Sequence, residues 1–429
     1  MNSPKTISEE FLQYVWENFL FFNEELKTVQ NKKLEVIDVG TRNTDSGPDF
    51  FNAKIKIEST IWAGNIEIHK SSGDWLKHNH QTDKAYNNVI LHVVETDNEP
   101  IELNQKPLPT LILKYPLKLK ENYQNLLDAR SWIACENQFY KIDPVLLLLG
   151  FNRLMIERLE EKTGEILSKL EQNNNNWNTT FYQFLAKMFG FKVNAIPFDL
   201  LAKSIPLEVL SKIKNNLFQL ETILFGNSGL LNEQLLGDDY YLKLRKEYSF
   251  LRKKYNLKGI ESHLWKFMRL RPGNFPTVRI AQFASLLHQS QSLFSKIVEI
   301  DNLPELKMLF NTEASEYWNS HYSFNKKSKR NCKKELGENS VNMIIINVVI
   351  PFLFVYGEKQ NKDFLKNRAL EFLEELPAEE NSIVKKWEKL GIKSRSAFES
   401  QALLQLKNKY CDQKKCLNCQ IGVKLIKGN

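Results

Sequence analysis

Hydrophobic residues in the first 115 positions recur with the period of one helix and then with that of several β-strands. A capping box at Thr6–Glu9 opens the helical part, and it predicts an amphipathic helix at 7–23. Four hydrophobic residues follow the box at helical spacing: Phe11, Val15, Phe19 and Phe22. Alternating or β-branched runs then predict strands at 34–39, 50–57, 61–69 and 89–94, a strand pair within 101–113, and a short helix at 82–88.

The period of two also predicts which side chains share a face of each strand. In the second strand the alternation groups one set of residues together: Phe51, Ala53, Ile55 and Ile57. In the third strand Glu67 and His69 fall on one face and Ile66 and Ile68 on the other. The short connection at 58–60 predicts a hairpin between these two strands, and a helix before the strand at 89–94 favours a parallel crossover.

Beyond residue 115 the hydrophobic pattern is helical. We therefore expect an α+β protein with an α/β domain at 1–115, a mainly helical domain at 116–406 and a cysteine-containing tail at 407–429. The most apolar run, 343–356, is too short to span a bilayer and contains Asn347 and Pro351, which predicts a buried core element. The N-terminus lacks the basic start and cleavage site of a signal peptide, so we expect a cytoplasmic protein without a membrane partner.

Composition and charge narrow the partners only slightly. The net charge of +8 and pI near 8.9 permit an anionic partner such as nucleic acid without requiring one. One basic run could contact phosphates or could be a solvated loop: Lys326, Lys327, Lys329 and Arg330. Protein partners and oligomeric state are not predictable from these patterns.

The residues with the clearest chemical meaning lie between positions 49 and 92. Four of the seven histidines fall there: His69, His78, His80 and His92. Asp49 and Glu67 lie in or beside strand-like apolar runs, where a carboxylate is costly unless it has a partner. Clustered histidines and carboxylates of this kind are typical of catalytic or metal sites, although surface ion pairs and structural histidines would give the same residues.

The helix–β–β–β–helix–β order, with Pro48-Asp49 and Glu67-Ile68-His69 on one hairpin, resembles the PD-(D/E)XK nuclease-like superfamily and its restriction-endonuclease-like α/β core. The resemblance implies that Asp49 and Glu67 hold Mg²⁺ or Mn²⁺, hard cations that carboxylate oxygens bind well. His69 stands where that superfamily has a lysine. Either His69 takes the catalytic role, or Lys54 or Lys56 reaches in from the neighbouring strand, or nuclease activity is absent.

Two other metal sites are compatible with the sequence. His78, His80 and Asp83, with His69 and His92, could hold Zn²⁺, Mn²⁺ or Fe²⁺ in a hydrolase of a small molecule. Near the C-terminus, the C-x4-C-x2-C spacing suits zinc or an iron–sulfur cluster. Its candidate ligands are Cys411, Cys416, Cys419 and, as a fourth, Cys332, with Cys135 or a histidine as alternatives; three ordinary thiols are the other interpretation. Five cysteines in so long a chain argue against a disulfide scaffold.

The whole chain resembles an uncharacterised family of bacterial proteins with a domain of unknown function. The resemblance is carried by segments at 46–57, 62–80, 83–94, 271–284, 347–357 and 410–422. It implies no activity, so whether the protein is an enzyme stays open. We expect a metal-dependent nuclease-like hydrolase of DNA or RNA, with two alternatives: a non-catalytic nucleic-acid-binding or scaffold protein on a degenerate nuclease core, and the small-molecule hydrolase.

Overall fold

The structure, a computed structural model, describes residues 8–231, 237–290 and 292–428, and the chain divides into two units. We call residues 1–150 with 406–429 the sheet unit, and residues 151–405 the helical unit. The sequence placed a boundary near 115 and treated 407–429 as a separate tail. In the structure residues 116–150 and 406–429 both belong to the sheet unit. These two segments pack on each other, and Asn122 Nδ2 donates to the Ile426 carbonyl at 3.1 Å.

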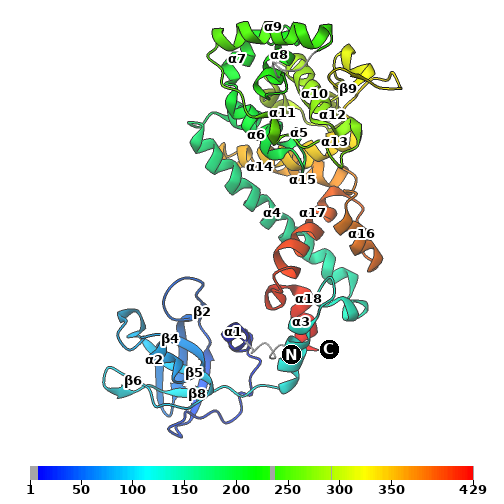
Figure 1. Cartoon of the computed structure of the whole chain (residues 1–429). Coiled ribbons are helices and arrows are strands. Elements are labelled where there is room, and N and C mark those ends of the chain that lie inside the picture. Colours follow the sequence, from blue (N-terminus) through cyan, green and yellow to red (C-terminus); the bar gives the residue numbers. More distant parts are fainter. Residues whose placement is uncertain (1–7, 232–236, 291, 429) are drawn as a thin grey trace. The chain divides into compact units, whose positions relative to one another are not determined.

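A six-stranded mixed sheet forms the centre of the sheet unit (Figure 1). Its strands are β1 (Leu34–Asp38), β2 (Thr41–Arg42), β3 (Phe50–Ile57), β4 (Thr60–Ser71), β5 (Val89–Thr96) and β8 (Thr110–Ile112). The order is β1-β3-β4-β5-β8, with β2 beside β3. The β3–β4 hairpin is antiparallel and β5 runs parallel to β4, as the sequence predicted. The strand pair expected within 101–113 becomes a small hairpin of β6 (Glu102–Leu103) and β7 (Lys106–Pro107), while β8 joins the main sheet parallel to β5.

One prediction about β3 was wrong. Phe50 pairs with Ile66 and Ala53 with Gly64, so the register shifts by one residue between them, and Asn52 has a φ of 58°. This bulge puts Phe50, rather than Phe51, on the buried face with Ala53. The pattern alone could not show it, because both positions are phenylalanine.

The helical elements of the sheet unit are shorter than predicted. The first helix, α1 (Glu9–Glu17), ends at Asn18 because Phe19 adopts a left-handed φ of 51°, which leaves Phe19 and Phe22 exposed. In place of a helix at 82–88 there is a short 3₁₀ turn, η1 (Lys84–Tyr86), and one further helical turn, α2 (Asp74–Lys77), lies between β4 and η1. The remaining elements are α3 (Leu117–Asp128), η2 (Glu136–Lys141), the start of α4 (Pro144–Gln172), η7 (Leu406–Cys411), η8 (Cys416–Asn418) and α18 (Gln420–Lys427).

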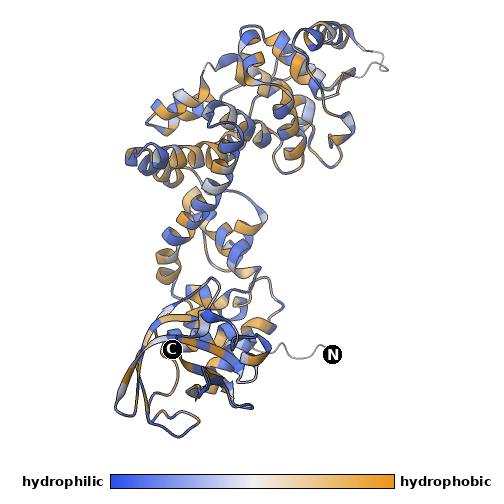
Figure 2. Cartoon of the chain, turned by 90° about the vertical axis from the view of Figure 1, so that its left-hand side faces the viewer, coloured by the Kyte–Doolittle hydropathy of each residue, from blue (hydrophilic) through white to orange (hydrophobic). Residues whose placement is uncertain are grey.

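The helical unit is almost entirely α-helical, with one small β-hairpin, β9 (His321–Ser323) and β10 (Lys326–Lys327). Its α-helices after α4 are α5 (Trp177–Phe189), α6 (Ala195–Ser204), α7 (Leu207–Ile213), α8 (Leu217–Asn227), α9 (Asp239–Lys254), α10 (Pro276–Gln289), α11 (Leu293–Glu299), α12 (Leu303–Leu309), α13 (Glu338–Ile344), α14 (Ile350–Lys359), α15 (Asp363–Glu375), α16 (Ser382–Lys389) and α17 (Ala397–Gln405). Short 3₁₀ turns η3 (Ser262–Leu264), η4 (Pro272–Asn274) and η5 (Glu316–Ser320) and the π-helical turn η6 (Ile345–Val349) complete it. In Figure 2 these helices carry both hydrophobic and hydrophilic residues, as expected for helices with one buried face.

The most apolar part of the chain lies inside the helical unit. Together α13, η6 and α14 form one helical stretch, Glu338–Lys359, which is long and apolar enough to cross a membrane. However, 72% of its most apolar window is buried, and its residues join the core of the unit. That burial is what a core helix of a soluble protein shows, in agreement with the sequence prediction for 343–356.

Candidate metal and active site

Asp49 and Glu67 meet at the edge where β3 begins beside the middle of β4. The Asp49 backbone N–H donates to Glu67 Oε2 at 3.0 Å, and the Ile68 backbone N–H donates to Asp49 Oδ2 at 3.0 Å. Each carboxylate is therefore held by the backbone of the other's strand. The predicted pair comes together because Phe50 pairs with Ile66 in the hairpin register, which places Asp49 next to Glu67.

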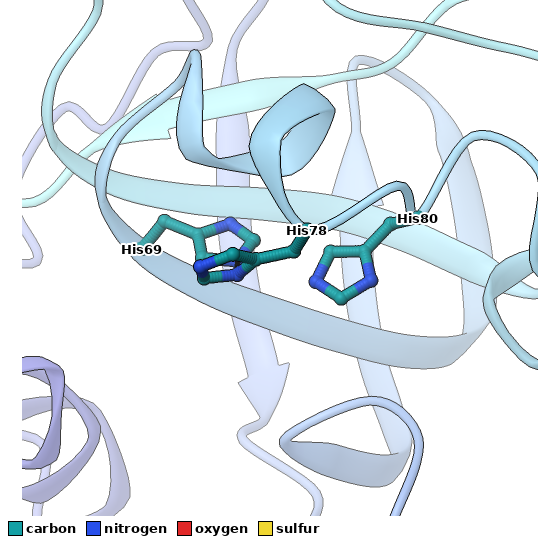
Figure 3. Close-up of side chains that lie close together, drawn as sticks. All are labelled: His69, His78 and His80. Carbon is teal, nitrogen blue, oxygen red and sulfur yellow. Dashed lines mark hydrogen bonds between the residues drawn. The ribbon is translucent and has the colours of Figure 1, made fainter.

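Three histidines gather around Glu67. Glu67 Oε1 lies 3.4 Å from His69 Nε2 and 3.3 Å from His80 Nε2. His78 reaches the same place from the loop after α2, with its Nδ1 at 3.2 Å from His69 Nε2. Figure 3 shows the three rings gathered together, and one nitrogen from each lies within 4.8 Å of the others. Such spacing is close enough for three imidazoles to share one cation.

His92, on β5, stands behind this group. Its Nε2 lies 2.9 Å from His69 Nδ1, in a contact buried on both sides. The parallel register pairs Glu67 with His92, so the two share a face of the sheet. His92 therefore fixes the ring of His69 and leaves the other nitrogen of His69, Nε2, directed at Glu67 and His78.

Burial keeps both acids protonated at higher pH than usual. Glu67 is 5% exposed, and burial raises its pKa to about 8. Burial, and next the charge of Glu67, raise the pKa of Asp49 to about 7. Two carboxyl groups in one desolvated place disfavour each other's ionisation, so near neutral pH this pair holds protons unless a cation replaces them.

The pKa values of the buried histidines shift in the opposite direction. Burial, and next the neighbouring imidazoles, lower the pKa of His69 to about 3, and burial likewise lowers the pKa of His92 to about 3 and that of His80. The contacts of Glu67 with His69 and His80 are therefore contacts between neutral groups at neutral pH rather than ion pairs. His80 Nε2 and His92 Nδ1 are buried and make no hydrogen bond with the described residues. Neutral imidazoles with uncommitted nitrogens are suitable metal ligands.

Several contributors to this site were not predicted. Gln13 on α1 donates from Nε2 to Asp49 Oδ1 at 2.7 Å, and Arg42 donates to Gln13 Oε1 at 3.1 Å. Glu9, also on α1, adds a negative charge that raises the pKa of both Asp49 and Glu67. The signal in the sequence was Gln13 itself, a polar residue inside the otherwise buried stretch Phe11–Trp16.

Two aromatic residues hold the histidine loop in place. Trp75 is fully buried and meets the rings of His69, His80 and His92 edge-on or tilted, with centroids 5.3–6.5 Å apart. The Tyr86 ring stacks on His80 at 3.8 Å. Trp75 belongs to a small hydrophobic cluster with residues of β5 and the β6–β7 hairpin. These aromatic residues build the wall of the site rather than expose a surface for stacking.

The structure places the remaining candidates of the sheet unit away from the acids. Lys54 pairs with Ala63 and Lys56 with Ile61, so Lys54 is four strand positions, or about 13 Å, from the level of Glu67. Lys54 is exposed. Asp83 is also exposed, and its Oδ1 accepts from the Ala85 N–H as the cap of η1, although its charge raises the pKa of His80. Lys54 therefore does not lie beside the two acids, whereas His69 Nε2 lies 3.4 Å from Glu67 Oε1.

The basic run lies in the helical unit. Lys326 and Lys327 form β10, and these two, Lys329 and Arg330 are all exposed. A second basic surface was not predicted: α9 and the segment after it line an open groove with Arg245, Lys246, Arg252, Lys253 and Lys258 against the single acid Glu261. The Asp238 N–H, at the start of α9, donates to Asn325 Oδ1 at 2.7 Å, so the basic hairpin and α9 are neighbours.

The cysteines fall into two groups. Cys411, Cys416 and Cys419 lie in the sheet unit, and there the thiol that approaches them is that of Cys135. Cys332 belongs to the helical unit, where it is exposed and its Sγ accepts from Lys334 Nζ at 3.0 Å. Of the two cysteines that the sequence offered as a fourth thiol, Cys135 lies in the same unit as the other three and Cys332 lies in the helical unit.

Comparison with known proteins identifies a family to which no activity is assigned. A family model described as "Protein of unknown function (DUF2851)" matches residues 9–382, a range that includes the acids and the histidines but ends before the C-terminal cysteines. The predicted extension of the likeness to 410–422 lies outside that range. No curated protein and no solved structure matches the chain. The chain thus belongs to the DUF2851 family of proteins of unknown function.

Proposed function

We propose that the sheet unit is a metal-dependent, nuclease-like phosphodiester hydrolase of the PD-(D/E)XK type that acts on nucleic acid. The observation that carries the proposal is the meeting of Asp49, directly before β3, with Glu67 on β4: Glu67 accepts a hydrogen bond from the Asp49 N–H, and Asp49 accepts one from the Ile68 N–H. The order of a helix, an antiparallel β1-β3-β4 meander and a parallel β5 supports it, since this is the order expected of a restriction-endonuclease-like core.

The donor set fits a divalent cation. The buried Glu67 and the half-buried Asp49 both have a raised pKa and lie next to imidazole nitrogens that form no hydrogen bond with the described residues, and the two acids are stabilised when a cation takes the place of their protons. Asp49 and Glu67 would hold the metal with one or more of His69, His78 and His80. Mixed oxygen and nitrogen donors favour Mn²⁺ over Mg²⁺, because Mg²⁺ prefers oxygen ligands and water. A bound cation would act as a Lewis acid toward a phosphoryl oxygen.

His69 stands where the PD-(D/E)XK superfamily has a lysine, and the pKa of His69 limits the role that it can take there. A general base works best when its pKa is near the working pH, and the pKa of His69 is about 3. Proton abstraction by His69 would therefore be weak, and a ligand or positioning role suits it better. His92 supports that role by fixing the ring through the 2.9 Å contact.

A second function is favoured by the histidines. Three imidazole nitrogens within 4.8 Å of one another are more than a two-acid nuclease centre requires. They support a hydrolase that uses Zn²⁺, Mn²⁺ or Fe²⁺ on a small molecule. The two functions differ in substrate, and the third possibility, a scaffold on a degenerate core, differs in lacking turnover.

The basic surfaces of the helical unit support nucleic acid as the substrate. The groove along α9 carries five cations against one acid, and the neighbouring β9–β10 hairpin adds exposed Lys326, Lys327, Lys329 and Arg330. Cations gathered in this way attract phosphates by counterion release without reading a base sequence. We therefore assign these surfaces to binding and Asp49 and Glu67 to cleavage.

The test is a cleavage assay with metal-free protein and added Mg²⁺, Mn²⁺ or Zn²⁺ on single- and double-stranded DNA and RNA. We expect Mn²⁺-dependent cleavage that is lost in Asp49→Asn and Glu67→Gln and kept in Glu102→Gln, a control at an exposed acid of the same unit. Cleavage that survives Glu67→Gln would come from a contaminant and would sink the proposal. Turnover of a small phosphodiester but of no nucleic acid would favour the second function, and failure of the protein to bind any of Mg²⁺, Mn²⁺, Zn²⁺ and Fe²⁺ would exclude both.

A further inference from the structure

The four cysteines of the sheet unit come from two segments that are far apart in the sequence. Cys135 precedes η2, while Cys411 ends η7, Cys416 begins η8 and Cys419 caps α18. Cys135 and Cys416 are each 9% exposed, and Cys411 and Cys419 are partly buried. All five cysteines of the chain lie in its described part, and none forms a disulfide there.

Packing between the two segments holds the cysteines together. Lys414, between Cys411 and Cys416, donates from Nζ to the carbonyl of Ala129 at 2.9 Å and also to that of Leu127. The Lys407 ammonium lies 5.3 Å from the centre of the Trp132 ring. These contacts bind the segment before Cys135 to the segment that carries the other three thiols.

The thiols are near enough to affect one another. The pKa of Cys135 is raised to about 12 by burial and then by the thiols of Cys419 and Cys416. The pKa of Cys411 is raised by burial and then by the thiols of Cys419, Cys135 and Cys416. The turns that carry the three C-terminal thiols are tight: the Lys414 N–H donates to the Cys411 carbonyl at 3.2 Å, and the Cys419 N–H donates to the Cys416 carbonyl at 3.4 Å.

A glycine shapes the turn that carries two of these cysteines. A Cβ at Gly422 would lie 2.1 Å from the carbonyl oxygen of Cys416 and 2.8 Å from its Cα. Only glycine therefore lets η8 fold so closely onto the first turn of α18, where Cys419 stands. Burial, and next the thiol of Cys419, raise the pKa of Cys416 to about 11, and the charges of Lys407 and Lys414 offset only part of the rise at Cys411 and Cys416.

We propose that Cys135, Cys411, Cys416 and Cys419 form a closed four-thiolate site for a soft metal centre, either one Zn²⁺ or an iron–sulfur cluster. Four thiolates are a complete ligand set for both, which suits a structural centre rather than a catalytic one. On binding, each thiol gives up its proton to solvent and its sulfur forms a bond to the metal. The site would tie the returning end of the chain to the sheet unit, independently of any hydrolase activity at Asp49 and Glu67.

The test measures zinc, iron and acid-labile sulfide in full-length protein purified without oxygen. We expect one zinc, or iron and sulfide in equal amounts, per chain, and loss of at least nine-tenths of the metal in Cys135→Ser and Cys411→Ser. Cys332→Ser is the matched control and keeps its metal, since Cys332 lies in the other unit. Gly422→Ala, which leaves all four thiols in place, lowers metal content by displacing Cys416.

Two measurements on the unaltered chain test the proposal even if the variants fail to fold. Co²⁺ exchanged into the site gives the intense visible spectrum of a tetrahedral four-thiolate complex, and a mercurial that titrates four thiols releases the metal. Protein without zinc or iron, a disulfide among these cysteines, or full metal content in Cys135→Ser would each overturn the proposal.

Discussion

Replacement of Glu67 by glutamine removes one buried titratable carboxyl group and keeps the shape of the side chain. Glu67 has a pKa of about 8 in the folded protein, against an ordinary value of 4.5. Between these values the folded protein holds a proton that the unfolded chain has released. The free energy of unfolding therefore falls as pH rises, by about 1.4 kcal/mol for each pH unit below the folded pKa.

From this slope, metal-free protein should lose about 1.5–2 kcal/mol of stability through Glu67 between pH 6.5 and 8. Glu67→Gln lacks this loss, and it also removes the nearest charge that raises the pKa of Asp49. The histidines have lowered pKa values, so their own effect is a gain of stability as pH rises toward 6.5, and it is the same in both proteins. The difference in pH dependence between the two proteins therefore reports the Asp49–Glu67 pair, because the variant removes the Glu67 carboxyl and also changes the pKa of Asp49.

The chain has two units, so the assay must report on the sheet unit alone. Protein equilibrated in urea at pH 6.5 or 8 with a chelator receives a brief deuterium pulse at one fixed pH, and mass spectrometry then reads the peptides of β4 and β5. Excess Mn²⁺ should stabilise the unaltered protein, by about 2.7 kcal/mol at 100 times its dissociation constant, and stabilise Glu67→Gln less. Equal pH slopes for the two proteins, or a Glu102→Gln control that also loses its slope, would refute the reasoning.

Two further predictions concern the surroundings of the acids. His92→Gln should weaken Mn²⁺ binding about 10–100-fold, because His69 loses the neighbour that fixes its ring, and calorimetric titration measures this; His288→Gln, in the helical unit, is the control and should bind normally. The double variant Arg252→Ala, Lys253→Ala should weaken DNA or RNA binding equally for all sequences and reduce the slope of log affinity against log salt by about 1–2. An unchanged salt slope would remove α9 from the binding surface.

The sequence predicted most of the sheet because β-strands show themselves by local alternation. Glu67 and His69 share a face for that reason, and the hairpin brings Asp49 to them. The bulge at Asn52 was not predictable, since Phe50 and Phe51 fill either face equally well. Gln13 and Glu9 were missed because contacts between α1 and the site depend on how the helix packs across the sheet, which no local period encodes.

The cysteines show a second limit of sequence reasoning. Spacing identified Cys411, Cys416 and Cys419 as a group, since they are close in the chain. The choice between Cys135 and Cys332 depended on which segment folds back with them, and the sequence carries no signal for that. The division into two units differs from the predicted domain bounds for the same reason, because α3 and the segment after residue 406 look like ordinary helical segments until they pack together.

The sheet unit consists of residues that precede the helical unit in the sequence and residues that follow it. The last part of the sheet unit is therefore synthesised after the whole helical unit. A ribosome produces Cys135 about 280 residues before Cys411, an interval of about 15–55 s at 5–20 residues per second. During that time the strands can pair, whereas the segments that carry Cys411, Cys416 and Cys419 are not yet available to the segment around Cys135. A nascent chain interrupted within the helical unit would carry the acids and histidines but not residues 406–428. Closure of the proposed four-thiolate site would thus be a late event in biogenesis, and it would distinguish chains that carry residues 406–428 from chains interrupted before them.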